Sequence, residues 1–160
     1  KYRLVGSEMC IRDRFKEVKK SRNIIKTKIQ NKSIPFEKLK LLKEGKNVDF
    51  NNEILKYKDY TKDSPKPRSY AYCADTQYDE NLLPIISNVD LLYHEATFLE
   101  QMKERAKKTQ HSTAKDAATM AKEANTKRLI IGHFSARYNE IINFEKEAKT
   151  IFENLSLIHI

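Results

Sequence analysis

Hydrophobic positions from residue 69 onward are concentrated in three short runs. These runs span residues 69–74, 89–94 and 127–132. A short apolar run that is bounded by polar residues is typical of a strand buried on both faces of a sheet. We therefore expect a buried strand at each of the three positions.

Helical patterns occupy the segments between and after these runs. Residues 82–86, 98–108 and 144–152 predict helices. Thr113 and Asp116 have the spacing of a capping box, which predicts the start of another helix. Alanines recur along that helix at helical spacing, so one of its faces can lie close against a sheet. Strands that alternate with helices predict a layered α/β architecture.

The first half of the chain has weaker patterns. Residues 24–29 predict a short helix, and residues 35–42 predict a second helix that ends at Gly45. Residues 46–68 contain asparagine and proline turns around a weak strand. We read these segments as scaffold.

Positive charge is concentrated in the same half. The 160-residue chain has 31 Lys and Arg against 22 Asp and Glu, a net charge of +9. Eleven of these lysines and arginines lie between residues 16 and 46. Such a surface attracts a polyanion such as RNA through counterion release, although a solvated lysine-rich face has the same composition.

Length and composition exclude several classes of protein. The length suits one domain or half of a larger one. No apolar stretch approaches the roughly 20 residues that cross a bilayer, so we expect no membrane partner. Two cysteines, Cys10 and Cys73, cannot form a disulfide framework, and we expect a cytoplasmic protein.

The two ends of the chain differ from the rest. Residues 5–14 and 155–160 resemble translated sequencing-adapter fragments. We therefore expect residues 1–14 and 155–160 to be non-native segments and residues 15–154 to form the native part, which excludes Cys10 and His159 from the chemistry. The alternative is a genuine start and an apolar final strand.

Side chains that bind metals or move protons follow all three predicted strands. Asp75 follows the first, His94 and Glu95 end the second, and His133 follows the third, while His111 precedes the capped helix. Each histidine alone is more typical of a structural role. Because strand ends converge at one edge of an α/β sheet, their shared placement favours a functional site.

Four motifs occur in order along the chain: residues 72–76 (YCADT), 94–98 (HEATF), 111–114 (HSTA) and 132–138 (GHFSARY). Together they resemble the C-terminal half of ribonuclease Z, the tRNA 3′-processing endonuclease of the metallo-β-lactamase superfamily, and the resemblance runs from about residue 15 to residue 154. It implies an α/β fold, the four-layer αββα sandwich, of which this chain is a C-terminal fragment.

The resemblance also implies roles for individual residues. Asp75 would bridge two zinc ions and His133 would bind one of them, with two Zn²⁺ per complete active site. His111 would help to protonate the leaving 3′ oxygen, and Glu95 is our candidate for the carboxylate that orients it. We expect His94 to be mainly structural.

Two further groups of residues would contact RNA. The phosphate near the scissile bond would be held by Ser112, Thr113 and Arg137. A loop that discriminates against tRNAs already bearing CCA would contain Lys20, Arg22 and Asn23, although Val18 replaces the proline of the family's loop.

The implied function is a zinc-dependent endoribonuclease that removes the 3′ trailer from precursor tRNA, as a homodimer in its full-length form. The family's HxHxDH motif does not occur in this sequence. We therefore expect an inactive fragment whose exposed apolar sheet face promotes aggregation. The alternatives are another phosphodiesterase or arylsulfatase of the same fold, or a non-catalytic RNA-binding remnant.

Overall fold

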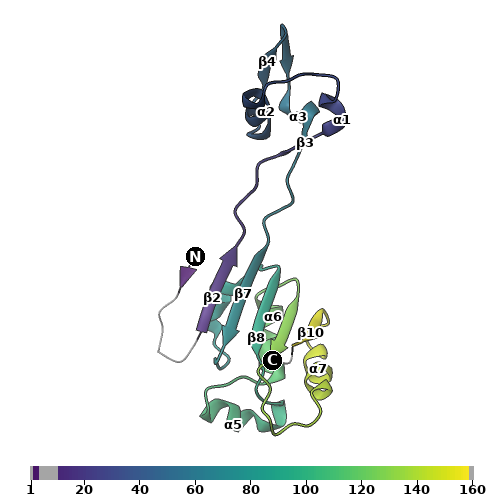
Figure 1. Ribbon diagram of the computed structural model, residues 1–160. Coiled ribbons are helices and arrows are strands. Elements are labelled where there is room, and N and C mark those ends of the chain that lie inside the picture. The colour runs from purple at the N-terminus through teal and green to yellow at the C-terminus, as the bar shows by residue number, and fades with distance from the viewer. Residues whose placement is uncertain (1, 4–10, 159–160) are drawn as a thin grey trace. The chain divides into compact units, whose positions relative to one another are not determined.

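The computed structural model describes residues 2–3 and 11–158 of the chain. Cys10 and His159 lie outside the described residues. The chain divides into two compact units. One unit is Glu17–Pro67, and the other contains the residues up to Lys16 together with those from Arg68 onward (Figure 1). The sequence patterns of residues 15–154, the expected native part, do not predict this division.

The larger unit is built on a sheet with the strand order β1-β2-β7-β8-β9-β10. Strands β7 to β10 are parallel to one another, while β2 pairs antiparallel with both β1 and β7. The three predicted strands are confirmed as β7, β8 and β9, which are neighbours in the sheet. The strands are β1 (Tyr2–Arg3), β2 (Ile11–Lys16), β7 (Ser69–Ala74), β8 (Leu91–Glu95), β9 (Leu129–Gly132) and β10 (Leu155–Leu157).

Helices connect the parallel strands. In the described part of the chain, none of them is long and apolar enough to span a bilayer. The final helix begins two residues before the predicted position 144 and ends at Lys149, because its last turn loosens into short-range hydrogen bonds. The helices are η1 (Glu80–Leu82), α4 (Leu83–Ile86), η2 (Glu100–Met102), α5 (Lys103–Lys108), α6 (Ala114–Glu123) and α7 (Ile142–Lys149).

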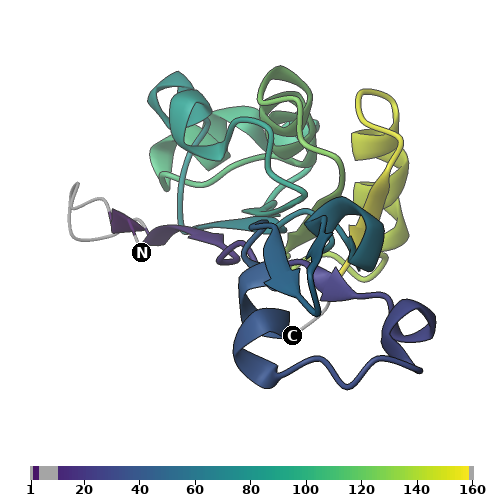
Figure 2. The same ribbon diagram turned by 90° about the horizontal axis from the view of Figure 1, so that it is seen from above.

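Helix α6 packs its alanine face against the sheet, as predicted. Its start has the capping box: the Asp116 N–H donates to the Thr113 hydroxyl, and the Thr113 N–H donates to the Asp116 carboxylate. Small side chains let the helix axis approach β8 and β9 closely. One core joins this face to Phe144 of α7 and to the apolar side chains of the central strands. Helices α6, in green, and α7, in yellow, lie on the same side of the sheet (Figure 2). The fully buried alanines of α6 are Ala114, Ala117, Ala118 and Ala121.

The opposite face of the sheet carries a row of aromatic rings. Phe15 stacks on Tyr70, and Tyr72 stacks on Tyr93 with ring centroids 4.6 Å apart. Phe15 is 41% exposed and Tyr72 is half-buried. This face therefore leaves apolar surface open to solvent, as expected.

Three of the described strands lie wholly or partly in the segments expected to be non-native. Strand β1 consists of residues 2–3, β2 includes residues 11–14, and β10 consists of residues 155–157. Pairing at the side of a sheet requires only an extended backbone with free N–H and C=O groups, so it does not distinguish native from foreign sequence. The assignment of residues 1–14 and 155–160 stays a prediction, and residues 1, 4–10 and 159–160 lie outside the described residues.

The smaller unit has its own core. Leu42 of α2 packs with Ile34, Val48 and Leu55, and Gly45 ends that helix with a left-handed backbone, φ 83°. Two short two-stranded sheets, β3-β6 and β4-β5, complete the unit. Its elements are β3 (Asn23–Ile24), α1 (Lys26–Ile29), α2 (Phe36–Lys43), β4 (Val48–Phe50), β5 (Glu53–Leu55), α3 (Tyr57–Tyr60) and β6 (Thr61–Lys62).

Asp90 ties together the starts of the three central strands. Its carboxylate pairs with Lys127, ahead of β9, and accepts hydrogen bonds from the Ser69 N–H at 2.7 Å and the Ser69 hydroxyl at 2.9 Å. The Lys127 ammonium and the Ser69 donors lower the pKa of Asp90 to about 2 from an ordinary value of 3.8. The ionised form is thus favoured in the folded state.

This arrangement predicts a pH-dependent contribution to stability. Because the folded pKa lies below the unfolded one, Asp90 stabilises the fold above about pH 4, and this stabilisation is lost as the pH falls toward 2. Asp90→Asn should lower the free energy of unfolding by about 1 kcal/mol at pH 7 and by almost nothing near pH 2. Urea denaturation of both proteins across this range measures the difference, and an equal loss at pH 7 and pH 2 would contradict the assignment.

Candidate metal centre

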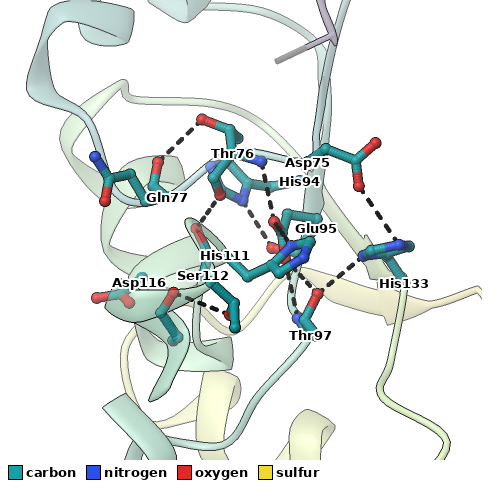
Figure 3. Close-up of polar contacts among 12 residues, drawn as sticks. Asp75, Thr76, Gln77, His94, Glu95, Thr97, His111, Ser112, Asp116 and His133 are labelled. Atoms are coloured by element: carbon teal, nitrogen blue, oxygen red, sulfur yellow. Dashed lines mark hydrogen bonds and ion pairs between the residues drawn. The ribbon is translucent and has the colours of Figure 1, made fainter. Parts of the chain in front are cut away.

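Three side chains of types that can bind a metal ion meet at the carboxyl ends of the parallel strands. Asp75 directly follows β7, His133 directly follows β9, and His111 lies in the loop before α6. One possible ligand atom from each of them lies within 4.8 Å of those of the other two. The Asp75 Oδ1 and His133 Nε2 atoms are 3.5 Å apart (Figure 3). The two residues predicted to share a metal are therefore neighbours at one edge of the sheet.

The backbone at both of these strand ends is unusual. Asp75 has φ 49° and His133 has φ 65°, both in the left-handed region. Residues with a Cβ are uncommon there, and each such conformation costs on the order of 1 kcal/mol. Its occurrence at two neighbouring candidate ligands indicates that the fold holds these side chains in place at the expense of stability.

A buried carboxylate lies behind the three donors. Glu95, the last residue of β8, has no exposed surface. Its Oε1 accepts from the Thr76 N–H at 3.0 Å and lies 2.7 Å from the His111 Nδ1. Its Oε2 accepts from the Thr97 N–H at 3.1 Å and the Thr97 hydroxyl at 2.7 Å. These four hydrogen bonds compensate for burial of the charge.

The Glu95–His111 contact agrees with the sequence-based hypothesis. The carboxylate receives the His111 Nδ1–H, so the Nε2 of that ring remains for a substrate or a metal. The imidazole of His111 is therefore fixed in one orientation beside the other two donors. His94 differs, since it is fully buried and its Nδ1 lies 2.8 Å from the backbone oxygen of Glu95, which fits the expected structural role.

The hydroxyls of Ser112 and Thr113 are not placed for the expected phosphate binding. Both residues have no exposed surface. The Ser112 hydroxyl donates to the Thr76 backbone oxygen at 2.6 Å. The Thr113 hydroxyl caps α6 and donates to the Glu100 carboxylate at 3.0 Å. Their hydrogen-bonding capacity is used inside the protein, so this expectation is corrected: both side chains shape the loop that carries His111.

Arg137 is exposed and keeps most of its donors. Its guanidinium carbon lies 5.4 Å from the centre of the Phe98 ring, and its Nε donates to the Ser135 hydroxyl at 2.9 Å. A guanidinium held over an aromatic ring in this way presents its remaining N–H groups to an anion.

The residues expected to recognise the tRNA 3′ end lie in the smaller unit. Arg22 donates to the Thr61 hydroxyl at 2.7 Å, pairs with Asp63, and lies 4.9 Å from the centre of the Tyr57 ring. This guanidinium therefore has a structural role in tying the two ends of the unit together. Lys20 and Asn23 are exposed.

Sequence reasoning missed two residues of the site, Thr76 and Thr97. Each follows a strand-end residue by one or two positions and supplies a backbone N–H to the Glu95 carboxylate. Both belong to motifs that were recognised as a whole, but no residue pattern predicts that a backbone amide faces a carboxylate.

The donor set fits a zinc ion. A carboxylate and imidazoles are ligands that zinc accepts, and catalytic zinc sites keep three protein ligands and an open position. Asp75 and His133 lie at the sheet edge and are partly open to solvent, with 44% and 46% of their side chains exposed. A second ion at this edge requires donors beyond the three that the described residues offer.

Comparison with known proteins places these features in context. No family model matches the chain. It is 44% identical over 145 residues to a protein named Ribonuclease Z from Cytophaga hutchinsonii, an alignment that covers 89% of this chain and 46% of that protein. The chain thus spans about half the length of the curated relatives it matches.

Two solved structures resemble the fold. The metallo-β-lactamase fold protein YhfI from Bacillus subtilis has a TM-score of 0.52 and 28% identity, covering 58% of this chain and 37% of YhfI. A long form RNase Z from yeast has a TM-score of 0.53 and 28% identity, covering 59% of this chain and 13% of the yeast protein.

The α/β sheet with polar side chains at the ends of its parallel strands is part of a metallo-β-lactamase-like fold. Within that class, the chain is homologous to about half of ribonuclease Z.

Proposed function

We propose that this chain forms part of a zinc-dependent endoribonuclease that removes the 3′ trailer from precursor tRNA by phosphodiester hydrolysis. The observation that carries the proposal is the convergence of Asp75, His111 and His133 at one sheet edge, with a buried carboxylate behind them. The relatives named Ribonuclease Z supply the reaction and the substrate class.

The residues of this chain would have separate roles in binding metal and phosphate. Asp75 has two carboxylate oxygens and would bridge two zinc ions, while His133 would bind one of them through Nε2. The ions, when bound, supply Lewis-acid stabilisation of the negative charge on the phosphodiester. Arg137 would bind a phosphate oxygen at the exposed side of the site through its free N–H groups.

His111 would provide the proton for the leaving 3′ oxygen. Its Nδ1–H donates to Glu95, so the proton to be transferred is carried on Nε2 of the imidazolium, which the Glu95 charge stabilises. The group left after transfer is a neutral imidazole in the same tautomer. Glu95 thus orients His111 without contacting the substrate.

Further parts of the proposal rest on the relatives. The remaining zinc ligands and the general base would come from a segment corresponding to the other half of ribonuclease Z. Homodimer formation and a cytoplasmic location remain predictions. Lys20, Arg22 and Asn23 remain candidates for discrimination of the tRNA 3′ end. The alternative of a non-catalytic RNA-binding remnant predicts RNA binding without cleavage.

A chimera tests the proposal. Residues 15–154 replace the corresponding segment of the Cytophaga hutchinsonii protein, and cleavage of a tRNA precursor with a 3′ trailer is measured with added Zn²⁺. We expect cleavage by the chimera and none by the 160-residue chain alone. RNA binding by a folded, zinc-loaded chimera that does not cleave would favour the non-catalytic alternative.

His111→Ala in this chimera should separate metal binding from chemistry. We expect unchanged zinc content and a chemical step that is slower by about 10²–10⁴-fold, the usual contribution of a general acid. Single-turnover cleavage and metal analysis of the purified protein measure the two effects. Loss of zinc together with activity would make His111 a ligand instead.

A further inference from the structure

The hydroxyl of Thr97 lies between the buried carboxylate and a candidate metal ligand. Its Oγ1 is 2.7 Å from the Glu95 Oε2 and 2.9 Å from the His133 Nδ1 (Figure 3). Thr97 is 8% exposed and Glu95 is fully buried, so water does not compete freely for these contacts. The Thr97 N–H also donates to the same carboxylate oxygen, which fixes the residue on both sides.

The number of protons available on these groups fixes the direction of their hydrogen bonds. The hydroxyl has one proton, whereas an ionised carboxylate can only accept. If the hydroxyl donates to Glu95, its lone pair accepts the Nδ1–H of His133. If it donates to His133 instead, its oxygen faces the carboxylate at 2.7 Å with no proton between them. Two acceptors at that distance repel, so the first arrangement is favoured.

We infer that Thr97 is a positioning residue that selects the Nδ1–H tautomer of His133 by relaying the charge of Glu95. In this tautomer the lone pair of His133 lies on Nε2, the nitrogen that faces Asp75. A metal ion binds an imidazole through a ring nitrogen that carries a lone pair and no proton. The inference rests on the metal site of the proposed function.

One carboxylate therefore sets the state of two histidines. Oε1 of Glu95 holds His111 directly, and Oε2 holds His133 through the Thr97 hydroxyl. Both rings are left with Nε2 at the sheet edge. The two contacts use different oxygens of Glu95. Removal of the Thr97 hydroxyl should therefore remove the tautomer preference of His133 and leave His111 unchanged.

The test compares Thr97→Val, which has the same shape but no hydroxyl, with Thr97→Ser, which keeps one. Ring ¹⁵N NMR of the histidine-labelled 160-residue chain at about pH 8 reports the tautomer of each histidine, and a His133→Gln variant assigns the signal. We expect Nδ1–H for His133 in the wild type and in Thr97→Ser, and loss of this preference in Thr97→Val. His111 should keep Nδ1–H in all three proteins.

Zinc affinity provides the second readout. In the chimera, which supplies the remaining zinc ligands, competition with a chelating dye should show binding to Thr97→Val that is weaker by about 10–100-fold, as for other residues that orient a metal ligand, and rescue in Thr97→Ser. An Nε2–H tautomer of His133 in the wild type would overturn the inference even if Thr97→Val does not fold. Wild-type affinity in a folded Thr97→Val chimera would overturn it as well. Failure of the unsubstituted chimera to bind Zn²⁺ would instead count against the metal site itself.

Discussion

Replacing Asp75 with alanine in the ribonuclease Z chimera is expected to abolish cleavage of the tRNA precursor. The loss should exceed about 10⁴-fold, the upper end of what removal of a general acid causes, because the carboxylate proposed to bridge the zinc ions is removed. Zinc content should fall at the same time. Single-turnover cleavage and metal analysis of the purified chimera measure both quantities.

Asp59→Ala is the matched control, since Asp59 is an exposed aspartate in α3 of the smaller unit. It should leave zinc content and cleavage unchanged. If Asp75→Ala retained full zinc, its assignment as the bridging ligand would be refuted even if cleavage were lost.

Glu95→Gln is expected to have the largest effect on stability. The amide has nearly the shape of the carboxylate. Its NH₂ group, however, would take the place of an oxygen that accepts hydrogen bonds, so donors would face donors. Loss of a buried charge that accepts four hydrogen bonds should lower the free energy of unfolding by about 3 kcal/mol. Urea denaturation of the chimera measures the change.

Glu104→Gln serves as the control, because the Glu104 side chain is 86% exposed and makes only a long ion pair with Lys107. Its effect should stay within about 0.5 kcal/mol. Equal stabilities of the two variants would show that Glu95 does not organise the site.

The central strands and the site edge could be predicted from the sequence. Strands β7, β8 and β9 are buried on at least one face by helices, so they appear as short apolar runs, and each run is followed by a residue with ligand chemistry. The left-handed backbone at Asp75 and His133 left no trace in the residue pattern. The sequence predicts the capping box at Thr113. The same residue is also predicted to bind phosphate, but a single hydroxyl can form only a few hydrogen bonds.

Long-range contacts explain the other differences. The structural partners of Arg22, Thr61 and Asp63, lie about forty positions away, so the local motif does not predict these contacts. Lysine-rich, weakly periodic sequence does not predict that Glu17–Pro67 packs as its own unit. Thr97 was quoted within a motif, and its role follows only from the distances to Glu95 and His133.

Zinc bound to the ribonuclease Z chimera, located by its anomalous X-ray scattering, tests the central claim most directly. We predict an ion between the Asp75 carboxylate and the His133 Nε2, at about 2.0–2.2 Å from each ligand atom. An ion bound elsewhere, with the side chains at positions 75 and 133 turned away from each other, would contradict the account.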